Sequence, residues 1–148
     1  MSDHHYFLAE AIAEARLGLA TGGIPIGAVI VVDGEIIGRG HNKRVQHGSA
    51  IHHGETNALE NAGRRPAHVY RQATMYTTLS PCALCTGSVL LYGIPRVVIG
   101  ENETFMGEED HLRSRGIEVV NLDNEECKQL MRDFIAEFPE LWNEDIGE

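Results

Sequence analysis

The sequence predicts an α/β sandwich, in which a mixed β-sheet opens with a hairpin and carries helices on both faces. An apolar, β-branched run at 26–32 is followed by Asp33-Gly34 and a returning segment at 35–40, which indicates the hairpin. Strand-like and helix-like segments alternate along the rest of the chain. The length of 148 residues suffices for one substantial core. We therefore expect one domain spanning residues 1–148.

The first half of the chain predicts two helices in addition to the hairpin. Residues 3–20 carry apolar side chains at helical spacing and are followed by Gly22-Gly23, which can end a helix. The positions expected to face the core are Phe7, Leu8, Ala11, Ile12, Ala15 and Leu19. The polar segment at 42–50 predicts a loop. A second helix is expected over 53–62.

The second half predicts three further strands and three further helices. The strands are expected at 74–79, 96–100 and 117–122, and the helices at 82–92, 108–115 and 124–138. Asp123 is placed to cap the last helix. Pro139 is expected to break that helix and to leave residues 140–148 as a tail.

Charge and cysteine content narrow the class of protein. The chain has 22 Asp and Glu against 12 Lys and Arg, a formal net charge of −10, and its basic groupings are short. Proteins that bind along a phosphate backbone usually present a basic stripe, so we expect no nucleic-acid partner.

No apolar run approaches the roughly 18 residues of a membrane span. Residues 1–20 lack a secretory signal pattern, and two of the three cysteines share one C-x-x-C, so we expect a cytoplasmic protein without disulfides.

Two short stretches carry the chemistry. The first is His53-Gly54-Glu55, and the second, Pro81-Cys82-Ala83-Leu84-Cys85, begins 26 residues after Glu55. Cys82 and Cys85 are three residues apart and therefore share one face of the predicted helix, where both thiolates can reach one metal ion. With His53 as the third ligand, the set predicts one catalytic Zn²⁺ per subunit, with a fourth position open to water.

Glu55 is the carboxylate that this ligand set leaves over. Zinc can lower the pKa of a bound water from about 15.7 to about 7, which makes a hydroxide available near neutral pH. Glu55 would take the proton of that water and deliver it to a ring nitrogen and then to the departing amine. The expected reaction is hydrolytic deamination of an amino-substituted heterocycle.

A closed structural zinc site is the alternative interpretation of the same cysteines. It requires a fourth protein ligand, for which the candidates are His47, His52 and Cys127. Glu55 would be dispensable in such a site. The acidic run 108–110 is interpreted as an exposed helix start, where negative charge suits the helix dipole.

The pattern H-x-E followed by P-C-x-x-C is the known signature of zinc nucleobase deaminases. The sequence resembles the cytidine/cytosine deaminase superfamily, and more closely the small fungal-type cytosine deaminases, over essentially its whole length. The segments that carry the resemblance are GGIPIG at 22–27, GRGHN at 38–42, GSA at 48–50, HGE at 53–55, LSPC at 79–82, YGIPR at 92–96, GEN at 100–102 and WNEDIGE at 142–148. Residues 69–78 and 105–107 are less typical of the family.

The resemblance implies four polar contacts to a bound base. The side-chain amide of Asn42 and the backbone N–H of Gly54 would hold the ring carbonyl and its neighbouring nitrogen. The backbone carbonyl of Ser80 would accept from the leaving amine, and Asp145 would contact the amine side of the base.

The resemblance also implies an apolar enclosure and an assembly. Phe105 and Trp142 would cover the base as a lid, and Ile26 would line the floor. Family members fold as a five-stranded sheet between helices in a three-layer α/β/α sandwich of the cytidine deaminase type, and they work as homodimers.

The leading functional hypothesis is deamination of free cytosine to uracil and ammonia, as in pyrimidine salvage. A deaminase of another small heterocycle, such as guanine, creatinine or a related cyclic amidine, is the first alternative. A tRNA adenosine deaminase is the second, against which stand the net charge and Gly54, where the tRNA enzymes typically carry alanine. A non-catalytic zinc module is the third.

Overall fold

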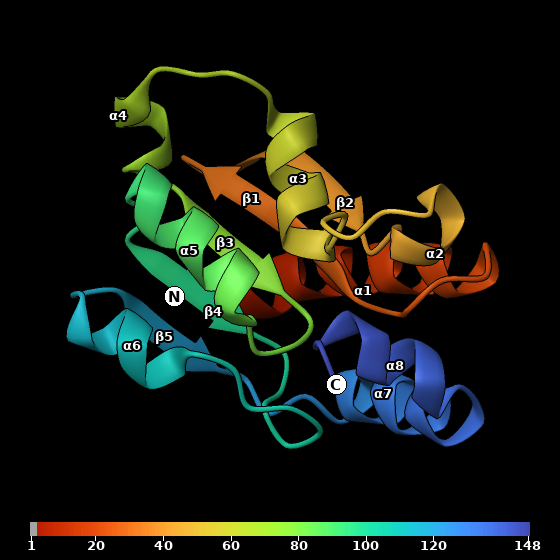
Figure 1. The fold of residues 1–148 in the computed structure, drawn as a ribbon. Coiled ribbons are helices and arrows are strands. Elements are labelled where there is room, and N and C mark those ends of the chain that lie inside the picture. Colours follow the sequence, from red (N-terminus) through yellow and green to blue (C-terminus); the bar gives the residue numbers. More distant parts are fainter. Residues whose placement is uncertain (1–2) are drawn as a thin grey trace.

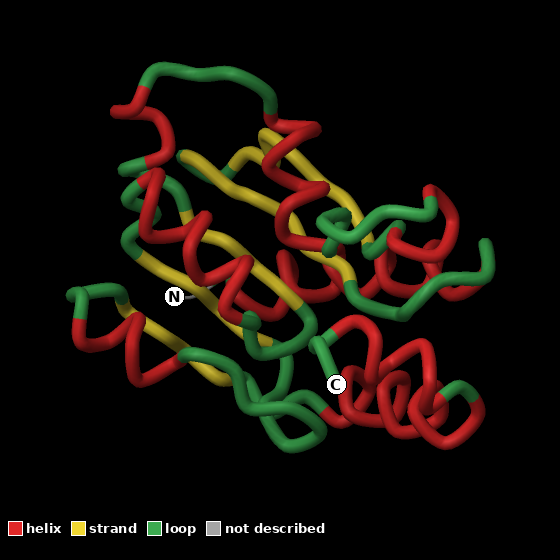
Figure 2. The backbone as a smooth tube through the Cα atoms, in the orientation of Figure 1, coloured by secondary structure: helices red, strands yellow, loops and turns green. Residues whose placement is uncertain are grey.

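The computed structural model describes residues 3–148, which form a mixed five-stranded sheet flanked by helices (Figures 1 and 2). The strands are β1 (Gly27–Val32), β2 (Glu35–His41), β3 (Thr74–Thr77), β4 (Arg96–Ile99) and β5 (Glu118–Asn121), in the sheet order β2-β1-β3-β4-β5. β1 pairs antiparallel with β2 and β3, whereas β3, β4 and β5 run parallel. The predicted α/β sandwich with its opening hairpin is confirmed.

Helices cover both faces of the sheet. On one face lie α3 (Gly54–Ala62), α5 (Ala83–Tyr92) and α6 (Glu109–Ser114), whose buried side chains pack against inward-facing residues of β1, β3 and β4. On the other face lie α1 (His4–Ala20) and the start of α7 (Glu125–Glu137). Successive strand residues point to opposite faces, so Val29 joins one core and Ile30 the other. Both side chains are fully buried, as a covered central strand requires.

Three short helices were not expected from the sequence. They are α2 (Arg44–His47), inside the predicted loop at 42–50, α4 (Ala67–Tyr70) and α8 (Pro139–Asp145). Pro139 separates α7 from α8 as predicted, but it stands in the first turn of α8, where its missing N–H costs nothing because that group has no partner inside a helix. The tail expected at 140–148 is therefore helical as far as Asp145.

Two smaller expectations are also wrong. The side chain of Asn124, and not Asp123, caps α7 by accepting from the backbone N–H of Cys127 at 2.9 Å. Asp123 instead has a positive φ of 50° in the preceding turn. Leu19 is 40% exposed, and Gly18, one residue earlier in the last turn of α1, is buried in its place.

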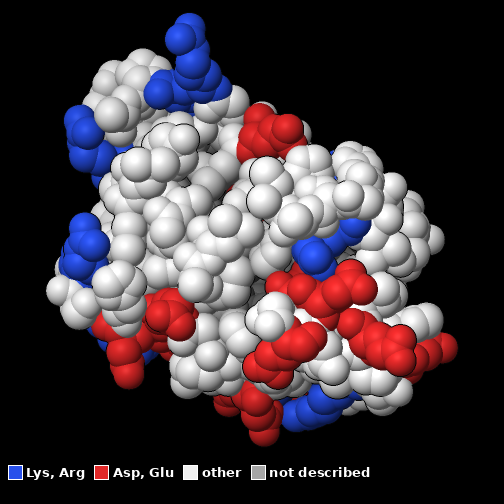
Figure 3. All heavy atoms as spheres, viewed as in Figure 1, with Lys and Arg blue, Asp and Glu red and all other residues white. Residues whose placement is uncertain are grey.

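One group of exposed acidic residues lies near the C-terminal end of the chain. Figure 3 shows acidic side chains over the end of α7 and over α8, where Glu137, Glu140 and Glu144 are exposed. Between residues 3 and 148, no helix is both long enough and apolar enough to cross a membrane.

Candidate active site

The predicted metal ligands converge where α3 and α5 begin. His53 is the N-cap residue of α3, Cys82 is the N-cap residue of α5, and Cys85 lies in the first turn of α5. One ligand atom from each lies within 4.8 Å of the other two. In the sheet, β1 lies between β2 and β3. The segment after β2, which contains α2, leads to α3, and the loop after β3 leads to α5. The topology thus brings together residues separated by 29 positions in the chain.

The three side chains form one hydrogen-bonded cluster, in which the metal-free thiolate of Cys82 is paired with the protonated imidazole of His53. A hydrogen bond with Cys85, aided by His53, lowers the pKa of Cys82 to about 4, whereas the same hydrogen bond, followed by burial, raises the pKa of Cys85. Burial opposes the charged form of His53, but Cys82 and Asp145 outweigh it and raise the pKa of the imidazole to about 9. The Cys82 Sγ and His53 Nδ1 atoms are 3.5 Å apart. Two sulfur donors and one imidazole nitrogen that face a common centre are the ligands that zinc prefers.

Glu55 lies in the first turn of α3, beside the ligand cluster. Its side chain is buried, and burial, followed by the nearby Cys82 thiolate, raises the pKa of its carboxyl to about 7. A carboxyl group with such a pKa can accept and return a proton near neutral pH. Glu55 is therefore equipped for proton transfer next to a site that can hold a metal ion.

A small cavity opens directly in front of the ligands. Its lining residues are Ile26, His53, Glu55, Leu79, Ser80, Cys82, Phe105, Trp142, Asp145 and Ile146. Sequence reasoning did not assign Leu79 or Ile146 to the site, although both lie within segments that carry the family resemblance. A larger hollow of about 520 Å³ lies on the outer side of α3 and α5, but the convergent polar groups belong to the small cavity.

Asn42 ties α8 to the loop that follows β2. Asn42 is fully buried and donates from Nδ2 to Asp145 Oδ1 at 2.8 Å, while its own Oδ1 accepts from the backbone N–H of Arg44 at 3.0 Å. Asp145 Oδ1 also lies 3.8 Å from His53 Nε2 and 3.8 Å from the Arg44 guanidinium. Burial raises the pKa of Asp145. Asn42 is thus not part of the cavity lining but holds a residue that is.

Gly54 shapes the back of the site by its lack of a side chain. A Cβ atom at this position would lie 3.0 Å from the backbone oxygen of Ile26, which is tighter than ordinary contact. The first turn of α3 can therefore approach β1 closely. This approach brings the N-terminus of α3, where His53 and Glu55 line the cavity, close to the start of β1.

Phe105 and Trp142 meet over the cavity from distant parts of the chain. Their rings make an edge-to-face contact with centroids 5.7 Å apart and an interplanar angle of 84°. Trp142 is 6% exposed and also packs in a third apolar cluster with Ile24, Leu79 and Phe134. The tryptophan therefore both anchors α8 to the core and contacts Phe105.

The candidate fourth ligands of a closed zinc site lie elsewhere. His47 and His52 contact each other near the surface, with their Nδ1 atoms 3.2 Å apart, and Cys127 is buried on the opposite face of the sheet. None of them belongs to the group formed by His53, Cys82 and Cys85 among residues 3–148.

One acidic residue departs from expectation, because Glu109 is 2% exposed and not at an open helix start.

The fold and this ligand set define a zinc enzyme with three protein ligands and a neighbouring carboxyl group. The family described as the cytidine and deoxycytidylate deaminase zinc-binding region matches residues 1–101. A cytosine deaminase of Candida albicans is 55% identical over 139 residues, which cover 93% of each chain. The chain belongs to this zinc-dependent deaminase family.

Other relatives extend the comparison. A tRNA-specific adenosine deaminase of Streptococcus pyogenes is 40% identical over 114 residues, covering 76% of this chain and 71% of that protein. A solved structure from work on A-to-I editing by tRNA:A34 deaminases superposes with a TM-score of 0.72 at 26% identity, covering 85% of this chain and 99% of the other. The α/β architecture and the zinc-binding character predicted from the sequence are thus both confirmed.

Proposed function

We propose that the protein deaminates free cytosine to uracil and ammonia, as a step of pyrimidine salvage. The observation that carries this proposal is the small cavity beside the metal ligands, which Phe105 and Trp142 cover. The cavity has only about 10 Å³ of free space, less than a base occupies, so its cover must open to admit even a free base and would have to open further for a ribose. The Candida albicans cytosine deaminase, alike over nearly the whole chain, supports cytosine as that base.

His53, Cys82 and Cys85 would hold the zinc, which when bound supplies a Lewis acid that activates water. Glu55 carries the proton in this scheme. Its carboxylate would accept one proton of the attacking water and pass it to the ring nitrogen beside the reacting carbon. It would then take the proton left on the added oxygen and give it to the departing amine as the carbon–nitrogen bond breaks.

Polar groups around the cavity would orient the base. The Asn42 amide and the Gly54 N–H at the start of α3 would hold the ring carbonyl and its neighbouring nitrogen, and the Ser80 carbonyl and Asp145 would receive the amine. Asn42 keeps one amide hydrogen beyond the one that it gives to Asp145. Ile26 would form the floor, with Phe105 and Trp142 as the cover.

Deamination of tRNA is the second candidate, because the Streptococcus pyogenes relative carries that name. The net charge of −10, the acidic surface over α8 and the covered cavity all disfavour a polyanionic substrate. We therefore place no nucleic acid among the partners and propose the cytoplasm as the site of action. Cysteines that serve as metal ligands, as Cys82 and Cys85 would, are typical of a reducing compartment.

Ammonia release from a panel of bases and nucleosides tests the function. The panel contains cytosine, 5-substituted cytosines, guanine, adenine, creatinine, cytidine and adenosine. We expect fast turnover of cytosine and none of cytidine. If another base is turned over and cytosine is inert, the assigned substrate changes but the proposed reaction does not. Turnover of adenosine within tRNA alone would contradict the proposal.

A homodimer would form through the outer side of α3 and α5. On this side, α5 carries three exposed apolar residues, Leu84, Leu91 and Tyr92, of which Leu91 is 74% exposed. Figure 3 shows a broad uncharged area over α5, with Lys and Arg at its upper and left margins and an acidic group beside it over α3. Covering such a patch with a second copy removes apolar area from water.

The oligomeric state tests this assignment. Leu91→Arg should convert the dimer to a monomer in analytical ultracentrifugation, because a buried cation at the centre of the contact has no partner. Leu17→Arg, on α1 and 51% exposed, is the matched control and should leave the dimer intact. A dimer that survives Leu91→Arg would place the contact elsewhere.

A further inference from the structure

The loop that carries Phe105 lies against the junction between β3 and α5. This loop, residues 100–108, joins β4 to α6. Ser80 N–H donates to the Glu101 carbonyl at 3.0 Å, and Glu108 N–H donates to the Pro81 carbonyl at 3.1 Å. A Cβ atom on Gly107 would stand 1.8 Å from the Pro81 oxygen. The 100–108 loop and the residues that lead into Cys82 are therefore in direct backbone contact.

Glu109 adds side-chain hydrogen bonds to this backbone contact. Its carboxylate is 2% exposed and accepts from the Ser80 hydroxyl, with a distance of 2.6 Å from Ser80 Oγ to Glu109 Oε2. The Asn102 amide donates to Glu109 Oε1 at 3.3 Å, and the Arg113 guanidinium lies 3.5 Å from the same oxygen. The Ser80 hydroxyl in turn accepts from the Gly107 N–H at 2.9 Å. We call Ser80, Asn102, Gly107 and Glu109 the latch.

The chemistry of the latch needs a carboxylate. A serine hydroxyl can donate one hydrogen bond, which Ser80 directs to Glu109. Its lone pairs remain free to accept the hydrogen bond from the Gly107 N–H. An ionised carboxylate only accepts hydrogen bonds, so it can accept one from the Ser80 hydroxyl and one from the Asn102 amide at the same time. A buried carboxylate is costly unless its acceptors are filled in this way, and truncating one partner would leave the others unsatisfied.

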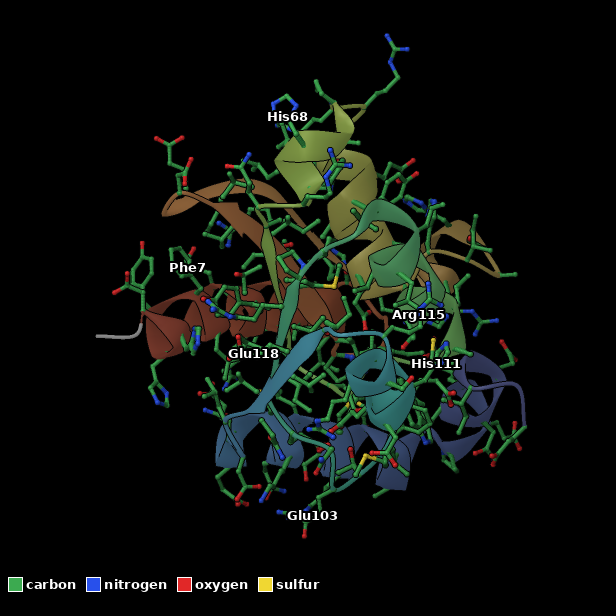
Figure 4. The ribbon with its side chains drawn as sticks, turned by 90° about the vertical axis from the view of Figure 1, so that its left-hand side faces the viewer. Phe7, His68, Glu103, His111, Arg115 and Glu118 are labelled. Carbon is green, nitrogen blue, oxygen red and sulfur yellow. The ribbon has the colours of Figure 1, made fainter. Side chains whose placement is uncertain are left out.

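The latch joins two parts of the proposed base-binding cavity. Ser80 and Phe105 both line the cavity, and the latch holds their two segments together from outside it. Elsewhere on the same loop, Glu103 projects outward in Figure 4, with its side chain 58% exposed. Glu101 on this loop is also buried, but its carboxylate accepts from Thr104 within the loop, whereas Glu109 accepts from Ser80 across the contact.

We propose that Glu109 is a positioning residue, which holds Phe105 over the cavity and the Ser80 carbonyl in place through the Ser80 hydroxyl. The inference rests on the proposed function for its kinetic part. Glu109 touches no substrate. It sets how tightly the base is held, because a freed 100–108 loop lets Phe105 move away from Trp142.

The test compares two latch variants with one control. Glu109→Gln keeps the size of the side chain and removes the charge, and Ser80→Ala removes the bridging hydroxyl but keeps the backbone carbonyl. Asp110→Asn is the matched control, since Asp110 is the next residue and its side chain is fully exposed. All three are prepared with zinc bound, and zinc content is measured for each.

We expect both latch variants to raise the KM for cytosine about tenfold, the size of one lost hydrogen bond to a charged group, with kcat changed less than about threefold. The double variant should be no worse than Glu109→Gln alone, because both changes break one network. Zinc content should stay at the wild-type level, and Asp110→Asn should match the wild type throughout.

A second readout needs no turnover. Trp142 is the single tryptophan of the chain, so acrylamide quenching of its fluorescence reports how well Phe105 covers it. We expect stronger quenching in both latch variants than in the control. Unchanged KM and unchanged quenching would overturn the proposal, as would a loss of zinc with the same KM, which would assign Glu109 to the metal centre. A wild type inert toward every base would refute the proposed function, while the quenching comparison would still decide on the latch.

Discussion

Among residues 3–148, the buried acidic side chains differ in how fully their oxygens are hydrogen-bonded. Glu109 accepts from Ser80 and Asn102, and Glu101 accepts from both the N–H and the hydroxyl of Thr104. Glu55 lies among the metal ligands, with only a thiol contact to Cys85 beside its own backbone. Carboxylates with filled acceptors hold structure in place, whereas one with few partners is free to exchange a proton.

Glu55→Gln should abolish turnover without disturbing the site. The amide keeps the shape of the side chain but cannot carry a proton between water and base, so kcat should fall by about 10³-fold or more. Zinc analysis and the melting temperature should match the wild type. Retained activity with zinc bound would refute the proton-transfer role.

Cys127 should make the protein less stable at alkaline pH. Burial, then Glu101 and Glu126, raise the pKa of this thiol to about 12 in the folded state, above its ordinary value of 9.0. Below pH 9 both states keep the proton. At higher pH the unfolded chain releases it first, so stability falls as pH rises toward the folded-state pKa.

The matching variant is Cys127→Ala, which cannot ionise. Between pH 8 and pH 10 the wild type should lose about 1 kcal/mol more of its free energy of unfolding than the variant, as measured by urea denaturation. Equal losses would show that the thiol does not contribute to the pH dependence.

At this scale the sequence predicted the metal ligands and missed the latch. His53, Cys82 and Cys85 follow a spacing that the chemistry of zinc imposes, so they can be found in a linear chain. Glu109 looks like an ordinary acidic residue at a helix start, and its role depends on Ser80, 29 positions away. Burial against a distant segment leaves no local pattern.

At the scale of elements, the 100–108 loop is held by close approach as well as by the latch. Gly107→Ala would place a methyl group where the Pro81 carbonyl lies, so one of the two segments must move. We expect a loss of about 1–3 kcal/mol in unfolding free energy, measured by denaturant unfolding of the zinc-loaded protein. Met106→Ala is the control, because Met106 is 59% exposed and should lose little.

Deleting residues 139–148 should affect catalysis more than folding. The deletion removes Trp142 and Asp145 from the cavity, while the sheet and the metal ligands belong to other elements. We expect zinc content and far-ultraviolet circular dichroism close to the wild type, with kcat/KM reduced more than about 10²-fold because the base is no longer enclosed. An unchanged rate would show that α8 does not cover the site.

The strands and long helices were predictable because apolar periodicity encodes them. The short helices were not. α2 has no buried residue to create such a pattern, and α8 spans seven residues with two buried side chains, Trp142 and Asp145. Contacts with Phe105, Asn42 and the third apolar cluster hold α8 in place, and they come from distant parts of the chain.

At the scale of the whole molecule, the metal centre links the two helices on which it is built. His53 belongs to α3 and the cysteines to α5, so a bound ion ties these helices together. Removal of zinc by a chelator should lower the melting temperature by about 10 °C, since a ligand at 1,000 times its Kd contributes about 4 kcal/mol. Added zinc should restore it. A melting temperature indifferent to chelation would mean that the ion does not stabilise the fold.

The acidic surface over α7 and α8 has a consequence for diffusional encounter. Glu137, Glu140 and Glu144 are exposed around the same helix that contributes Trp142 and Asp145 to the cavity. An uncharged molecule feels no long-range force from them, so its association rate should not vary with ionic strength. A phosphorylated nucleotide is repelled before it makes any contact, and added salt would weaken that repulsion. The acidic surface should therefore lower the association rate of negatively charged ligands before they make any contact inside the cavity.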